Sequence, residues 1–104
     1  MYRQGDVLII PVKSIPNDVE AIKREGGRVV LAHGEVTGHA HAIKDKRATL
    51  FRDPKLAAIF MQVSGDAPVD LEHDEHSTIA IPPGNYQVVR QVEYSPAEIR
   101  NVAD

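Results

Sequence analysis

The 104-residue sequence contains no cysteine and no tryptophan, and aromatic residues make up only 5% of it. The absence of cysteine excludes disulfide bonds, cysteine-ligated zinc and thiol nucleophiles. With so few aromatic rings, the core has to be built from Val, Ile, Leu and Ala, and the β-branched residues of this set suit strands. Composition alone therefore favours an aliphatic, β-rich core.

The sequence also lacks an excess of positive charge, a signal peptide and a long apolar run. Its formal net charge of −3 at pH 7 gives no overall reason to bind nucleic acid, so a nucleic-acid partner is not expected. The N-terminus lacks the basic-then-apolar pattern of a signal peptide, and no apolar run approaches membrane-spanning length. We expect a cytoplasmic protein with no membrane partner.

What the chain does contain is a series of short, strand-like segments separated by Gly and Pro turns. Apolar residues make up 42% and charged residues 26%, which is typical of a globular protein, and the length suits one domain over residues 1–104. The expected strands are residues 7–12, 28–32, 35–43, 49–52, 56–63, 69–72, 78–81 and 86–94; residues 56–63 also fit a helix. The pattern predicts a mainly β fold, a small barrel or sandwich.

Two segments have helical signals. In residues 14–27, Asn17 can cap a helix, Val19 and Ile22 fall on one helical face, and a pair of glycines ends the segment. Near the C-terminus, Ser95–Glu98 forms a capping box with proline at the first helical position. We therefore expect one or two short helices, including a C-terminal one that docks on the β domain or on a partner chain.

The last expected strand alternates most clearly. Tyr86, Val88, Val92 and Tyr94 share one face of it with Arg90. Such a face can stack on bases or other rings, but the interleaved valines favour packing in the core, with the arginine reaching out at the edge.

The most unusual residues are histidines. If residues 35–43 are extended, Glu35, His39 and His41 share one face, while small residues occupy the other. Two imidazoles two residues apart on a strand point the same way and can share one metal ion. The His-x-His pair is therefore a candidate metal site, with Glu35 as a further ligand or general base.

A second histidine segment, residues 73–76, reads His-Asp-Glu-His. In a straight strand His73 and His76 would face opposite ways, so their joint ligation requires a turn or bulge. Four histidines, His39, His41, His73 and His76, exceed the three or four ligands that zinc, iron, manganese or nickel sites require. We expect these four to bind one divalent ion, with Glu75 as the candidate catalytic base, unless they are merely solvated surface histidines.

The motif Gly38-His39-Ala40-His41, followed by Asp45 and later by Pro82-Pro83-Gly84, resembles a reduced cupin pattern. In cupins, His-x-His on a barrel strand, a following Glu and a later His bind a divalent metal, and a Pro-x-Gly turn marks a barrel corner. The resemblance implies a small β-barrel with metal at His39 and His41. Here Asp45 stands in place of the Glu and Gln87 in place of the later His, while the 73–76 segment has no cupin counterpart. The chain is also similar to small bacterial and phage-associated proteins with a GHxH…HxxH…PPGxY pattern, which brings no function with it.

Two functions of different classes follow from these patterns. The first is a divalent-metal-binding β-barrel protein with a histidine cluster, which extends to a metal-dependent enzyme acting on a small molecule. The alternative is a non-catalytic module that homo-oligomerises or docks to a larger assembly, with the histidines as a pH-sensitive contact. A nucleic-acid binder with a local basic patch is a third and minor alternative. The sequence does not decide whether the protein is an enzyme.

Overall fold

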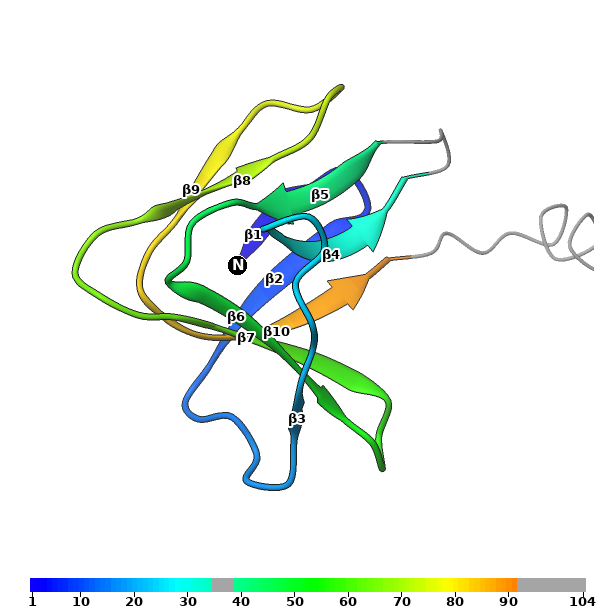
Figure 1. The fold of residues 1–104 in the computed structure, drawn as a ribbon, viewed down its shortest axis with the longest axis vertical. Coiled ribbons are helices and arrows are strands. Elements are labelled where there is room, and N and C mark those ends of the chain that lie inside the picture. The colour runs from blue at the N-terminus through cyan, green and yellow to red at the C-terminus, as the bar shows by residue number, and fades with distance from the viewer. Residues whose placement is uncertain (35–38, 92–104) are drawn as a thin grey trace, which may run out of the picture.

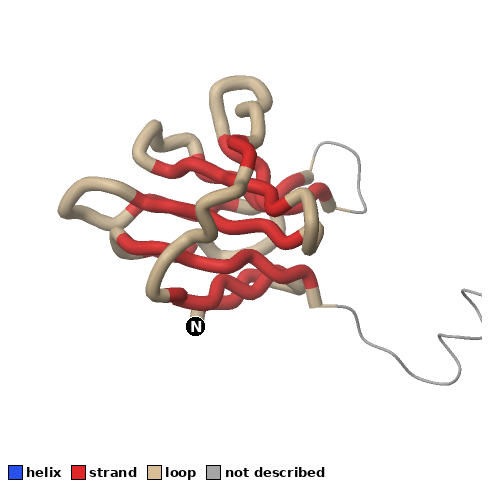
Figure 2. Tube along the Cα trace, turned by 90° about the horizontal axis from the view of Figure 1, so that it is seen from below, coloured by secondary structure: helices blue, strands red, loops and turns tan. Residues whose placement is uncertain are grey.

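The computed structural model describes residues 1–34 and 39–91, which form β-strands and no helix (Figures 1 and 2). The strands are β1 (Tyr2–Gln4), β2 (Val7–Val12), β3 (Glu20–Ala21), β4 (Val29–His33), β5 (Ala40–Ile43), β6 (Ala48–Asp53), β7 (Ala58–Val63), β8 (Val69–Glu72), β9 (Ile79–Ile81) and β10 (Gly84–Arg90). They pair antiparallel in two sheets, with the orders β1-β2-β10-β7-β6-β3 and β4-β5-β8-β9. The described residues include no helix that could cross a membrane.

The mainly β prediction is confirmed, but the strands described here form two open sheets and not a closed barrel. The helix predicted for residues 14–27 is wrong. The segment runs as a loop along the edge of the six-stranded sheet, where β3 pairs with β6 and Ile22 N–H donates to Leu50 C=O at 2.8 Å. Ile22 packs against the core from there, so tertiary contacts override the helical spacing. The C-terminal helix predicted from residues 95–98 lies outside the described residues.

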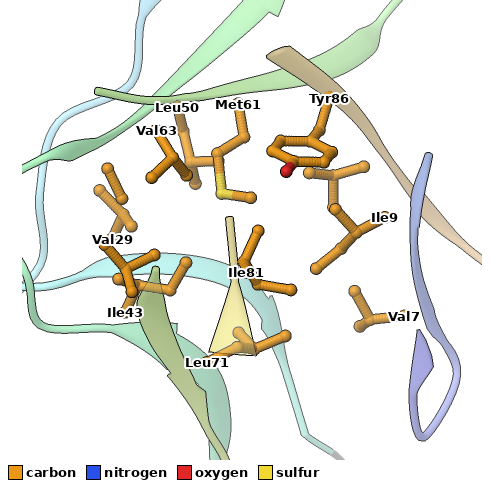
Figure 3. Close-up of a cluster of buried hydrophobic side chains, with 13 residues drawn as sticks. Val7, Ile9, Val29, Ile43, Leu50, Met61, Val63, Leu71, Ile81 and Tyr86 are labelled. Atoms are coloured by element: carbon orange, nitrogen blue, oxygen red, sulfur yellow. The ribbon is translucent and has the colours of Figure 1, made fainter. Parts of the chain in front are cut away.

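The hydrophobic core lies between the two sheets (Figure 3). Strand alternation sends every second side chain inward, so both sheets contribute aliphatic residues and Tyr86 adds the one ring of the cluster. The six-stranded sheet supplies Val7, Ile9, Ala48, Leu50, Met61, Val63, Tyr86 and Val88, and the four-stranded sheet supplies Val29, Ile43, Val69, Leu71 and Ile81. Full burial of a Val, Leu, Ile or Met side chain stabilises the fold by about 1.5–3 kcal/mol. This core fixes the two sheets against each other.

The predicted inward face of β10 is confirmed where the structure describes it. Tyr86 and Val88 are buried in the core, and Arg90 follows on the same face at the end of the strand. Val92 and Tyr94, which were expected on this face, lie outside the described residues. The core-facing side of β10 is therefore apolar at Tyr86 and Val88 and ends in the charged side chain of Arg90.

The same change from apolar to polar occurs on the strands that lie opposite. On β5, Ile43 belongs to the core and His41 lies on the same face, while Ala40 and Ala42 lie on the other face, as predicted. Asp6 lies in the turn between β1 and β2, and together with His41 and Arg90 it lines one cavity. One end of the space between the sheets is thus polar and open, and the candidate site lies there.

Candidate functional site

The polar end of the intersheet space holds a cavity of about 310 Å³. Residues from both sheets and from three loops line it: Gly5, Asp6, Gly34, His39, His41, His73, Glu75, His76 and Arg90. All four histidines predicted as metal ligands are therefore brought together, along with Glu75, the candidate base. Glu35 lies outside the described residues.

The four imidazole rings are closely spaced. Ring centroids are 4.3 Å apart for His41 and His73, 4.7 Å for His73 and His76, 5.7 Å for His41 and His76, and 5.9 Å for His39 and His73. Imidazoles that bind one tetrahedral ion with metal–nitrogen distances of about 2.0–2.1 Å have centroids about 5 Å apart. The rings of His41, His73 and His76 are therefore mutually close enough to share a metal ion, and His39 lies next to His73.

Sheet register and a loop bring the two histidine segments together. Ala42 on β5 pairs with Glu72 on β8, and continuing this register by one residue places His41 opposite His73. The chain then leaves β8, and residues 73–78 form a loop instead of a straight strand. This loop supplies the turn that the sequence required for His73 and His76 to act together.

Gly5 makes room for the last of these rings. It has a φ of 58°, in the left-handed region that favours glycine, and a Cβ at this position would lie 2.7 Å from His76 Nε2. The imidazole of His76 therefore packs directly on the glycine backbone. Any larger residue at position 5 would displace that ring.

Gln4 fixes the proton position of His41. Both residues are buried, and His41 Nδ1 lies 2.8 Å from Gln4 Oε1. Gln4 Nε2 donates to the carbonyls of Leu71 and Ser77 at 2.9 and 3.0 Å, which orients the amide and leaves Oε1 as the acceptor for the ring. His41 Nδ1 must then carry the proton, so Nε2 of the neutral ring has an unshared lone pair.

That lone pair faces a carboxylate. His41 Nε2 lies 3.6 Å from Asp6 Oδ1, while Asp6 Oδ2 accepts a hydrogen bond of 2.8 Å from Arg90 Nε. The hydrogen bond from Arg90 lowers the pKa of Asp6 below its ordinary value, so Asp6 is ionised at neutral pH. Burial, followed by the charge of His73, lowers the pKa of His41 to about 4, so this ring is neutral. Two acceptor atoms thus face each other with no proton between them.

Two of the other three rings, those of His73 and His39, have hydrogen-bond or ionic partners of their own. His73 Nδ1 accepts a bond of 3.0 Å from Glu75 N–H, which leaves the proton of the neutral ring on Nε2. His39 lies between two carboxylates, with Nε2 3.5 Å from Asp74 and Nδ1 3.3 Å from Glu75. Across residues 1–34 and 39–91, no group of three His, Asp or Glu side chains could hold a metal ion as it stands. Ligation by His73 would first require the release of its bond to Glu75.

The fifth histidine and the remaining cupin-like positions lie elsewhere. His33 is exposed and lies 3.3 Å from Glu25, as expected of a surface histidine. Asp45 forms an ion pair with Arg47 and does not line the cavity. Gln87 alternates with the core residues of β10 and so faces away from the core. The residues that stand in the cupin ligand positions after the His-x-His pair are therefore not at the site.

Three residues of the site were not identified from the sequence. Gln4 lies in the edge strand β1, Asp6 lies in the tight turn after it, and Arg90 lies at the end of β10. No sequence motif links these three residues. The glycine between Gln4 and Asp6 marks the turn, but only the pairing of β2 with both β1 and β10 shows that this turn and Arg90 are neighbours. Their role depends on sheet register, which a single sequence does not reveal.

Comparison with protein families matches residues 3–91 to the family described as Domain of unknown function (DUF8820). The match includes all ten strands of the described residues except the first residue of β1, and every residue that lines the cavity. The chain matches no curated protein and no solved structure.

Proposed function

We propose that this chain, which belongs to the DUF8820 family, binds a divalent metal ion in the histidine cavity. His41 and Asp6 are the first two ligands, and His76 and His73 complete the set. The cavity brings together the residue types that such ions prefer, imidazole and carboxylate, and the chain has no thiolate to compete with them.

The observation that carries this proposal is the contact between His41 Nε2 and Asp6 Oδ1. Two ligand atoms at about 2.0–2.2 Å from one tetrahedral ion lie about 3.4 Å from each other. The separation here is 3.6 Å, and each atom is already oriented by a partner on its far side, Gln4 for the ring and Arg90 for the carboxylate. Such outer partners are typical of metal-binding histidines and carboxylates. A cation between the two acceptors would satisfy both.

The remaining ligands determine which metal the site prefers. His41, His76 and Asp6 alone would make a set of two histidines and one carboxylate, which is typical of iron(II) with open coordination positions. Recruiting His73, once it releases Glu75 N–H, would give three imidazoles and a carboxylate, a set that suits zinc. Manganese and nickel accept the same donors, so the preference has to be measured.

Catalysis is a further step of the same proposal. Glu75 lines the cavity, and its carboxylate lies 3.3 Å from His39 Nδ1, so it is placed to take or hold a proton next to a bound molecule. A metal-dependent reaction on a small molecule would use this group as the general base. The non-catalytic interaction module is the alternative, and it requires no metal.

Elemental analysis of untagged protein tests the proposal, together with calorimetric titration of zinc, iron(II), manganese and nickel. We expect one ion per chain in the wild type, loss of that ion in His41→Ala, and full retention in His33→Ala, which removes an exposed histidine outside the cavity. Absence of metal from the wild type after reconstitution would contradict the proposal. Sedimentation at neutral and mildly acidic pH would then test the interaction module, because protonated histidines should weaken association.

A further inference from the structure

We infer that the metal site holds a small oxyanion, a carboxylate or a phosphate group, between the metal ion and the guanidinium of Arg90. This inference rests on the proposed function and names the class of molecule that the site accepts. It is carried by the position of Arg90, by the charge of the cavity and by the size of the cavity.

Arg90 uses only one edge of its guanidinium within the protein. Nε donates to Asp6 Oδ2 at 2.8 Å, and within residues 1–34 and 39–91 neither terminal nitrogen has a hydrogen-bond acceptor. The side chain is half exposed and lines the cavity with the four histidines. Four N–H donors of a planar group are therefore available beside the proposed metal, and this is the geometry that binds carboxylate and phosphate oxygens in pairs.

The charge of the cavity favours an anion. Among the lining side chains, Asp6 and Glu75 carry carboxylates and Arg90 carries a guanidinium. A divalent ion added to this set leaves one positive charge in a partly enclosed space. A bound oxyanion would neutralise it, whereas a cationic ligand would be repelled by both the metal and Arg90.

The volume of the cavity restricts the ligand to a small molecule. At about 310 Å³ it lies at the lower end of the range of ligand pockets, about 300–1,000 Å³. One carboxylate or phosphate group with a few further atoms fits such a space, and a polymer chain does not. Gly5 and Gly34 at its wall keep it from being narrower still.

Cobalt(II) provides a spectroscopic test, because its visible absorption changes with its ligands. The cobalt-loaded wild type, Arg90→Gln, Arg90→Lys and Arg3→Gln would each be titrated with acetate and with inorganic phosphate. Arg3→Gln is the matched control: it removes the same charge from a residue that bonds to Gln91 Oε1 and does not line the histidine cavity. The cobalt affinity of every variant is measured first.

We expect a saturable spectral change in the wild type and in Arg3→Gln, at least tenfold weaker anion binding in Arg90→Gln, and partial recovery in Arg90→Lys, which restores the charge without the planar fork. If cobalt binds but the anions leave the spectrum unchanged, or if Arg90→Gln responds like Arg3→Gln, the oxyanion inference is wrong and the metal site stands. If the wild type binds no cobalt, the proposed function fails and this inference fails with it.

Discussion

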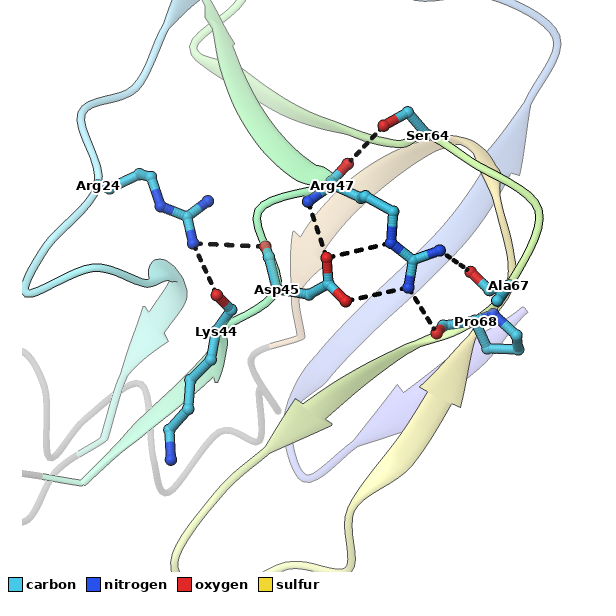
Figure 4. A network of polar contacts seen from close by, with 7 residues as sticks. All are labelled: Arg24, Lys44, Asp45, Arg47, Ser64, Ala67 and Pro68. Carbon is cyan, nitrogen blue, oxygen red and sulfur yellow. Dashed lines mark hydrogen bonds and ion pairs between the residues drawn. The ribbon is translucent and has the colours of Figure 1, made fainter.

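Two clusters of charged and polar side chains differ in how their hydrogen-bond donors and acceptors are paired. In the first, built on Asp45 and Arg47, the guanidinium of Arg47 donates to both oxygens of Asp45 and also to the carbonyls of Ala67 and Pro68 (Figure 4). Arg24 adds donors to the carbonyls of neighbouring turns. This cluster ties three loops together, and its donors are matched by acceptors.

The histidine cavity has the opposite character. His41 Nε2 and Asp6 Oδ1 are both acceptors, and they face each other at 3.6 Å. Gln4 orients the ring and Arg90 orients the carboxylate through hydrogen bonds on the opposite side of each group. Two acceptors that face each other have no proton to share, and a cation placed between them would interact favourably with both. Matched donors and acceptors therefore indicate a structural role, whereas two facing acceptors indicate a ligand site.

The largest expected difference between the clusters is in metal affinity. His41→Ala removes a proposed ligand and should weaken zinc binding by more than the roughly 10–100-fold that is typical of losing an outer-shell partner. Asp45→Ala should leave zinc affinity unchanged, although it breaks the ion pair with Arg47. Competition titration against a chromophoric chelator measures both, and equal losses in the two variants would mean that the clusters do not differ in this way.

Gln4 should connect stability with metal binding. Gln4→Ala leaves the buried carbonyl of Leu71, the carbonyl of Ser77 and His41 Nδ1 without their partner, so the free energy of unfolding should fall by about 2–4 kcal/mol. Zinc affinity should also fall by about 10–100-fold, because the ring of His41 is no longer oriented. The control is Gln62→Ala, which removes an exposed glutamine bonded to Asn85 and should have little effect on either quantity. Chemical unfolding and zinc titration test this prediction.

Acid should affect His41 of the histidine cavity and Asp45 of the first cluster in separate pH ranges. The pKa of His41 is about 4 in the folded protein against 6.5 ordinarily, because of burial and the charge of His73, so between these values the unfolded chain binds more protons. The metal-free protein should therefore lose on the order of 2–3 kcal/mol as pH falls from 6.5 to 4. The hydrogen bond from Arg47 lowers the pKa of Asp45 below 3.8, so its contribution is present above 3.8 and is lost as pH falls further.

Urea unfolding of metal-free protein from pH 7 to pH 3 would separate these ranges. His41→Gln should reduce the loss between pH 6.5 and pH 4, and Asp45→Asn should reduce the loss below pH 3.8. A wild-type stability that stays constant between pH 7 and pH 4 would contradict the buried, neutral state of His41.

A smaller effect is expected from substituting two glycines that each adopt a left-handed backbone conformation. Gly5 has a φ of 58° and Gly26 a φ of 62°, so alanine at either position is strained by about 1–3 kcal/mol. A Cβ at position 5 also meets the ring of His76, whereas nothing lies within 4 Å of one at position 26. Gly5→Ala should therefore destabilise the fold more than Gly26→Ala does, and it alone should weaken zinc binding. Thermal unfolding and zinc titration of the two variants measure the difference.

Much of the fold could be predicted from the sequence because strands carry local signals. The alternation around Tyr86 and Val88 identifies core-facing residues, and β2 and β8 have the predicted bounds. The 14–27 segment was mispredicted because its helical spacing is overridden by pairing at a sheet edge, where Ile22 is anchored to Leu50. The local sequence pattern of residues 14–27 does not indicate that they pair with β6.

The candidate site was predictable only in part, for a related reason. His39, His41, His73 and His76 were visible because rare residue types recur at ligand spacing. Gln4, Asp6 and Arg90 are common residue types whose importance comes from distant partners.

A direct test of the central claim is the nitrogen-15 NMR spectrum of the His41 ring, recorded with and without one equivalent of zinc. Without metal, we expect the proton on Nδ1 and an unprotonated Nε2, as the hydrogen bond to Gln4 requires. With zinc, the Nε2 resonance should shift strongly while Nδ1 keeps its proton. A proton on Nε2, or an Nε2 resonance that zinc does not move, would contradict the account.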